Sequence, residues 1–183
     1  AQQSHLTHYG LTAFSQVFQG VKRQLGGDMQ LAAFSDIYFE MMQKLDYTET
    51  ASGNQVTLTK PKDLKALIEA YPAETIKVKA PEVNLIVIDI HPNDAAKPEM
   101  HQQDVLGIIH HLFQNSPAEF QCTVMVDITL NHISEAEVHN IRNESLLYIK
   151  SGQLNLVFNQ SLTKFAQFGM DKHSGGLMFH FND

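Results

Sequence analysis

The strongest constraint on the fold is a pair of nearly continuous apolar runs, Asn84–Ile90 and Cys122–Ile128. A strand with one face in water alternates apolar and polar residues, whereas a strand covered on both faces is apolar throughout. These runs therefore predict central strands of a parallel sheet that has helices on both sides. Four further β-rich runs are found along the chain: Met29–Phe34, Gln55–Thr59, Leu154–Phe158 and Leu177–Phe181.

Helical patterns separate these runs. One stripe repeats at the helical period and consists of Val105, Ile108, Ile109, Leu112 and Phe113. A second helix is expected over Leu11–Leu25 and should end at Gly26-Gly27. A third should have Pro61 and Asp63 in its first turn. A capping box at Ser134 and Glu137 predicts the start of a fourth helix, which should end at Gly152. Alternating strands and helices predict an α/β fold with a mostly parallel sheet flanked by helices. Because no linker interrupts the pattern, we expect residues 1–183 to form one domain.

Composition narrows the possible partners and compartments. The net charge of −7 offers no basic surface for nucleic acid or an anionic membrane. No apolar run approaches the length of about 18 residues that a spanning helix needs, and no signal-peptide pattern opens the chain. The single cysteine, Cys122, rules out an internal disulfide framework and favours a reducing compartment. We therefore expect a cytoplasmic protein that binds neither nucleic acid nor membrane.

Two charged residues follow predicted strands and could carry chemistry. Lys164 lies in Ser161-Leu162-Thr163-Lys164, at the carboxyl end of a strand, where open α/β sheets bind ligands. A lysine that is partly desolvated there can form a Schiff base, although the local pattern alone favours a solvated loop lysine. Asp127 closes an apolar strand and could engage a cation or simply cap a helix. Asp89 is a rival carboxylate near another strand end.

The order of these elements resembles the fold-type-I pyridoxal-phosphate (PLP) enzymes, the aminotransferase and cystathionine-lyase group. Those families carry a strand-end Asp, a helix, a strand, a Ser-x-x-Lys or Ser-x-Thr-Lys segment, and then a phosphate-binding cation and glycines. The separation of 37 residues from Asp127 to Lys164 is close to that of the aminotransferase branch. The matching elements here are Val126-Asp127, the helix from Ser134, Leu154–Phe158, Ser161-Leu162-Thr163-Lys164, Lys172 and Gly175-Gly176.

Upstream segments resemble the same group. Tyr9-Gly10-Leu11-Thr12-Ala13 opens a helix as a phosphate cup does, Tyr38 follows a strand, and His91-Pro92-Asn93 contains an asparagine. The resemblance implies PLP as cofactor and these roles: Lys164 forms the aldimine, Asp127 contacts the pyridinium nitrogen, Tyr38 stacks on the ring, Asn93 contacts its phenolic oxygen, and Gly10, Leu11, Thr12, Ser161 and Lys172 surround the phosphate. It also implies a small amino-group substrate and a homodimer.

The chain departs from the family pattern in several places. Family members are about twice as long and add a C-terminal small domain that supplies a substrate-binding arginine. The arginines here are Arg23 and Arg142, and Arg142 lies mid-helix, where a surface position is expected. Leu130 occupies the position at which aminotransferases often have Tyr, and Lys172 occupies the position of their phosphate-binding arginine. Transamination and lyase or elimination chemistry both stay open, and so does whether the chain is an active enzyme.

Two other functions remain as alternatives. One is a catalytically inactive PLP-fold domain used for binding or assembly, in which Asp127 and Lys164 form a salt bridge. The other is a metal-dependent hydrolase, for which His91 with Asp89 and His132 near Asp127 are the best candidate ligands. His110-His111 cannot easily ligate one ion, because adjacent helix positions point about 100° apart. The remaining candidates, His5, His8, His101 and His139, are expected on the surface.

Overall fold

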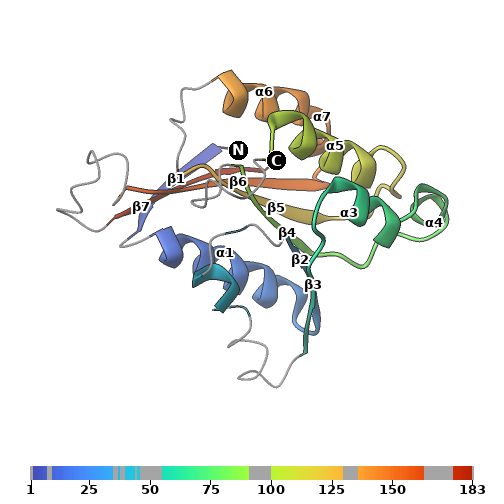
Figure 1. The fold of residues 1–183 in the computed structure, drawn as a ribbon, viewed down its shortest axis with the longest axis horizontal. Coiled ribbons are helices and arrows are strands. Elements are labelled where there is room, and N and C mark those ends of the chain that lie inside the picture. Colours follow the sequence, from blue (N-terminus) through green and yellow to red (C-terminus); the bar gives the residue numbers. More distant parts are fainter. Residues whose placement is uncertain are drawn as a thin grey trace.

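A computed structural model describes residues 2–7, 10–34, 37, 40–43, 45, 55–90, 100–129, 136–162 and 175–182. Within these residues, seven strands form one sheet in the order β1-β7-β6-β5-β4-β2-β3 (Figure 1). The strands are β1 (Gln2–Thr7), β2 (Met29–Ala33), β3 (Val56–Thr59), β4 (Leu85–Asp89), β5 (Cys122–Asp127), β6 (Leu154–Ser161) and β7 (Gly176–Phe181).

The sheet is mixed but mostly parallel. Strands β2 to β6 run parallel to one another, whereas β7 is antiparallel to both of its neighbours, β6 and β1. This confirms the predicted α/β class. The sequence did not indicate β1, because Gln2–Thr7 has little apolar character, and pairing with β7 from Gln2↔Phe181 to Thr7↔Gly176 holds it in the sheet.

Helices cover both faces of the sheet, as Figure 1 shows. On one face α1 (Gly10–Leu25) packs against β6 and β7. On the other face lie α3 (Leu64–Ala70), α4 (Ala73–Val78), α5 (Gln102–Phe113), α6 (Ala136–Glu144) and α7 (Leu146–Lys150). No helix in the described part of the chain has the length and apolar character needed to cross a bilayer.

Strand β6 shows why the two faces of the sheet differ. Its residues alternate between apolar Leu154, Leu156 and Phe158 and a second set that contains Asn155 and Asn159. Since successive side chains of a strand point to opposite faces, Leu154, Leu156 and Phe158 share one face of β6 with Gln160, and Asn155 and Asn159 share the other with Val157. Both sets are largely buried. The polar set faces α1, because Asn155 lines a pocket together with residues of α1.

Most element boundaries lie within about a residue of the predicted ones, and two differ for clear reasons. Strand β6 was expected to stop at Phe158 but continues to Ser161, because backbone pairing with β7 extends to Ser161↔Gly176. The helix expected to include Pro61 begins at Leu64 instead, since Asp63 is its N-cap. A third difference is that the single helix expected between Ser134 and Gly152 is divided at Ser145 into α6 and α7. Gly152 follows α7 with φ of 75°, where the stop was expected, and Ser134 lies outside the described residues.

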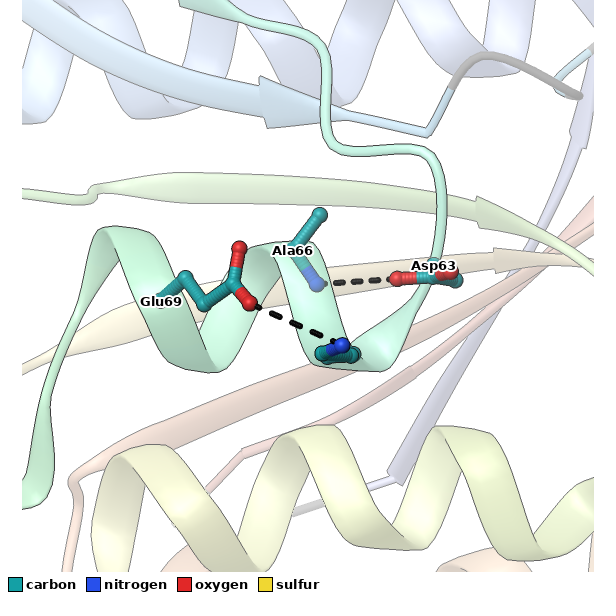
Figure 2. A network of polar contacts seen from close by, with 4 residues as sticks. Asp63, Ala66 and Glu69 are labelled. Atoms are coloured by element: carbon teal, nitrogen blue, oxygen red, sulfur yellow. Dashed lines mark hydrogen bonds and ion pairs between the residues drawn. The ribbon is translucent and has the colours of Figure 1, made fainter.

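The Asp63 cap stabilises the start of α3, and its contribution can be measured. Asp63 Oδ1 accepts a hydrogen bond of 2.8 Å from the backbone N–H of Ala66 (Figure 2). Asp63→Ala leaves that N–H without a side-chain partner, so we expect the free energy of unfolding to fall by about 1 kcal/mol. Urea denaturation measures it. Glu69→Ala is the control, because the exposed Lys65–Glu69 pair at 4.0 Å should contribute less than about 0.5 kcal/mol. Equal losses in both variants would contradict the cap.

Candidate functional site

Carboxylates gather where the parallel strands β4 and β5 end. Asp89 is the last residue of β4 and Asp127 the last of β5, and the two are partners in the strand register. Asp127 is also paired with Asn159 on β6. The carboxyl edge of an open α/β sheet is the usual place for a ligand. This edge therefore brings together the predicted Asp127, its rival Asp89, and the end of β6 at Ser161.

Asp127 is buried and held at both oxygens. Its side chain is only 4% exposed. Oδ1 accepts a hydrogen bond of 2.8 Å from the backbone N–H of Thr129, and Oδ2 accepts one of 2.9 Å from Nδ2 of Asn159. An ionised carboxylate only accepts hydrogen bonds, so two donors aimed at it favour the charged form. The carboxylate is thus held in one orientation at the carboxyl edge of the sheet.

Asn159 is itself completely buried and only half satisfied. Its side chain has 0% exposure, and Oδ1 has no hydrogen-bond partner among the described residues, whereas Nδ2 donates to Asp127. The amide cannot turn round without losing that bond, because the carboxylate needs a donor. A buried polar atom without a partner costs about 1–3 kcal/mol.

Thr129 joins the carboxylate to the end of β6. Its backbone N–H donates to Asp127, and its Oγ1 accepts a hydrogen bond of 3.1 Å from the backbone N–H of Ser161. Asp127 and Ser161 therefore belong to one polar network, although they lie on different strands.

The beginning of α1 lies directly against Ser161. A Cβ added to Gly10 would be 3.0 Å from Cβ of Ser161 and 3.2 Å from its Cα, so the closeness of this approach depends on glycine. The N–H groups of the first helical turn, to which Leu11 and Thr12 belong, have no acceptor within the helix. No acidic residue occupies this turn, while Lys22 and Arg23 lie in the last. An anion is therefore favoured at this end of α1.

The end of β6 and the start of β7 meet beside Ser161. The backbone N–H of Leu162 donates to the carbonyl oxygen of Gly175 at 2.9 Å, next to the Ser161↔Gly176 pair. Lys164 follows Leu162 by two positions in the sequence. Lys164 itself lies outside the described residues, and the same is true of the predicted site residues Tyr38, Asn93 and Lys172.

Sequence reasoning missed Thr129 and Asn159. Asn159 was placed beyond the end of its strand, although the alternation that places Asn155 opposite Leu154 and Leu156 continues through Asn159 to Ser161. That period was the available signal. Thr129 gave no signal, since its role depends on two hydrogen bonds made after β5 has ended.

The metal alternative receives no support from the described residues. They contain no group of three or more His, Cys, Asp or Glu side chains that could hold an ion, and the candidate ligands His91 and His132 lie outside them. Asp89 is 7% exposed and makes polar contacts of its own. His110 and His111 have structural partners, the hydroxyl of Tyr148 at 3.2 Å and the carbonyl oxygen of Tyr71 at 2.6 Å.

Two further residues are placed away from the network. Cys122 is buried at the start of β5, and burial raises the pKa of its thiol far above the usual range, so the side chain behaves as a small hydrophobe. The guanidinium of Arg142 lies 5.2 Å from the centroid of the Phe181 ring, on the face of the sheet opposite to α1. The expectation of a plain surface position for Arg142 therefore gives way to a partly buried cation–π contact.

A pocket of about 370 Å³ lies elsewhere under α1. Gln16, Gly20 and Gln24 of α1 line it, and Thr123, Asn155 and His180 lie opposite. Burial lowers the pKa of His180, and the positive charge that His5 can carry lowers it further. Of the predicted site residues that the structure describes, none lines this pocket.

Comparison with known proteins supports the fold. A crystal structure of an aromatic-amino-acid aminotransferase from Burkholderia pseudomallei, covalently bound to pyridoxal phosphate, superposes with a TM-score of 0.63 at 12% identity, over 100% of this chain and 42% of that one. O-acetylhomoserine sulfhydrylase of Wolinella succinogenes superposes with a TM-score of 0.63 at 12% identity, over 97% of this chain and 42% of that one. An aromatic amino acid aminotransferase with 3-indolebutyric acid superposes with a TM-score of 0.61 at 8% identity, over 99% of this chain and 43% of that one.

The chain therefore has the α/β fold found in these sulfhydrylase and aminotransferase structures. It spans about two fifths of their length. No protein-family model and no curated protein sequence matches it.

The Thr129 link can be tested by its effect on stability. Thr129→Val keeps the branched shape but removes the oxygen that accepts from the Ser161 N–H. We expect the free energy of unfolding to fall by about 1 kcal/mol, measured by urea denaturation. Thr57→Val, at an exposed position on β3, is the matched control and should change little. If the two variants are equally stable, the hydrogen bond from the Ser161 N–H to the Thr129 hydroxyl does not stabilise the end of β6.

Proposed function

We propose that this chain binds pyridoxal 5′-phosphate at the carboxyl edge of β5 and β6 and uses it for chemistry on a small amino-group substrate. The observation that carries the proposal is Asp127, a buried carboxylate with a hydrogen-bond donor at each oxygen. It lies in one network with Ser161, against which the N-terminus of α1 is packed. A cationic group and an anionic group of one ligand could thus be bound a short distance apart.

The residues present fit the two charged ends of PLP. A fixed carboxylate suits the protonated pyridine nitrogen, because the pair of opposite charges keeps the proton on the ring. The N–H groups at Gly10, Leu11 and Thr12, which have no acceptor within the helix, and the hydroxyl of Ser161 suit the phosphate. Gly10 contributes by its missing Cβ, which would otherwise fill the space against Ser161.

The other roles rest on the resemblance in sequence. In this proposal Lys164 attaches the cofactor covalently, and its amine then moves a proton at the substrate carbon once it has been displaced. Tyr38 stacks on the ring, Asn93 contacts its phenolic oxygen and Lys172 adds a positive charge near the phosphate. When bound, PLP supplies an electron sink for bonds at the amine-bearing carbon.

The reaction type stays open between transamination and lyase or elimination chemistry. The structures with the same fold include both aminotransferases and an enzyme of sulfur transfer, so the fold favours neither. Because the chain spans about two fifths of those proteins, the activity, the substrate and the proposed homodimer all belong to the proposal.

A second candidate function is an inactive PLP-type fold used for binding or assembly. The observation in its favour is that both oxygens of Asp127 already bond within the chain, to Thr129 and Asn159. In that case the carboxylate serves to hold β5 and β6 together, and Lys164 has no special reactivity. The two candidates differ in whether Lys164 forms an imine.

Absorption spectroscopy with added PLP separates these candidates. We expect a protein-dependent visible band and, after borohydride reduction, a permanent adduct on Lys164 that peptide mass spectrometry locates. Lys164→Ala should lose both, and Lys150→Ala, which removes an exposed lysine at the end of α7, should keep both. No band in the wild-type chain, or an unchanged band in Lys164→Ala, would overturn the Lys164 assignment.

A further inference from the structure

We infer that Asn159 is a positioning residue that orients the Asp127 carboxylate towards the ring nitrogen of PLP. This inference rests on the proposed function and deepens it. It begins from the 2.9 Å hydrogen bond between Nδ2 of Asn159 and Oδ2 of Asp127, in which both side chains are almost completely buried.

The way Asn159 is bonded argues for more than a structural role. A carboxamide that serves only to fill a buried space is normally hydrogen-bonded at both ends. Here the donor end is used on Asp127, while Oδ1 is buried with no partner in the described part of the chain. An apolar side chain of similar size would avoid that unsatisfied oxygen. What Asn159 provides, and an apolar side chain cannot, is the donor to Asp127.

Asn159 and Thr129 together fix the plane of the carboxylate. Thr129 N–H bonds to Oδ1 at 2.8 Å and Asn159 to Oδ2, so rotation of the carboxylate would break both bonds. The two donors also favour the ionised form, which the proposed contact with the ring nitrogen requires. Loss of Asn159 removes the hydrogen bond that its Nδ2 donates to Oδ2, and with it one restraint on rotation of the carboxylate.

Strand β6 connects the two halves of the proposed site. Asn159 and Ser161 are two positions apart, so they lie on the same face of β6 and about 7 Å apart along it. Asn159 holds the Asp127 carboxylate by a hydrogen bond, and Ser161 lies against the N-terminus of α1. One short stretch of strand therefore determines where the acidic end of the site lies relative to the phosphate end.

The test uses Asn159→Leu, with Asn155→Leu as the matched control. The control makes the same substitution on the same strand and face, at a position that lines the pocket under α1 and not the carboxyl edge. Two quantities are measured in the full chain: the dissociation constant of PLP, and the NMR shift of its ¹⁵N-labelled ring nitrogen, which reports the proton on the ring. Thermal unfolding of the proteins without PLP establishes that each variant folds, and Asn159→Val replaces Asn159→Leu if the larger side chain prevents folding.

We expect Asn159→Leu to weaken PLP binding about tenfold and to move the ring-nitrogen shift towards the unprotonated value, while Asn155→Leu changes neither. The change in ring protonation is a result that a merely structural residue would not produce. A wild-type-like shift and affinity in the Asn159 variant would overturn the inference and leave the proposed function standing. A wild-type chain that binds no PLP would overturn both.

Discussion

The hydrogen bonds to the Asp127 carboxylate are the interactions on which the site depends. A buried negative charge is unfavourable by several kcal/mol unless donors replace the water it has lost. Thr129 N–H and Asn159 Nδ2 supply those donors, one to each oxygen. Because Asn159 is on β6 and Asp127 on β5, their bond also ties two central strands together at the carboxyl edge. The local chemistry and the alignment of the strands there are therefore coupled.

The fold supplies this arrangement through the two unlike faces of β6. Leu154, Leu156 and Phe158 belong to the face covered by the larger layer of helices, whereas Asn155 and Asn159 belong to the face of α1. The apolar face stabilises the sheet in the usual way, by removing hydrocarbon from water. The face towards α1 can then carry polar groups, and the helix that covers it brings its N-terminus to Ser161.

The sequence was sufficient to predict the parts of the structure that depend on local patterns. The apolar runs at β4 and β5 predicted central parallel strands, and Asp127 was recognised because it closes one of them. It was insufficient for β1, whose polar residues are held by pairing with β7, and for Thr129, whose contacts join separate strands. Strand ends depend on the neighbour that continues the backbone pairing, which is why β6 was expected to stop before Asn159.

The central claim is that Asp127 is the carboxylate that binds the cofactor, and its direct test is the dissociation constant of PLP for Asp127→Asn compared with Asp89→Asn. Asn159 can turn its unpaired Oδ1 towards the new amide, so the Asp127 variant should fold. We predict that Asp127→Asn weakens binding about tenfold or more, since a charge-assisted contact is lost, and that Asp89→Asn has a much smaller effect. Equal effects, or a larger effect at Asp89, would contradict the account.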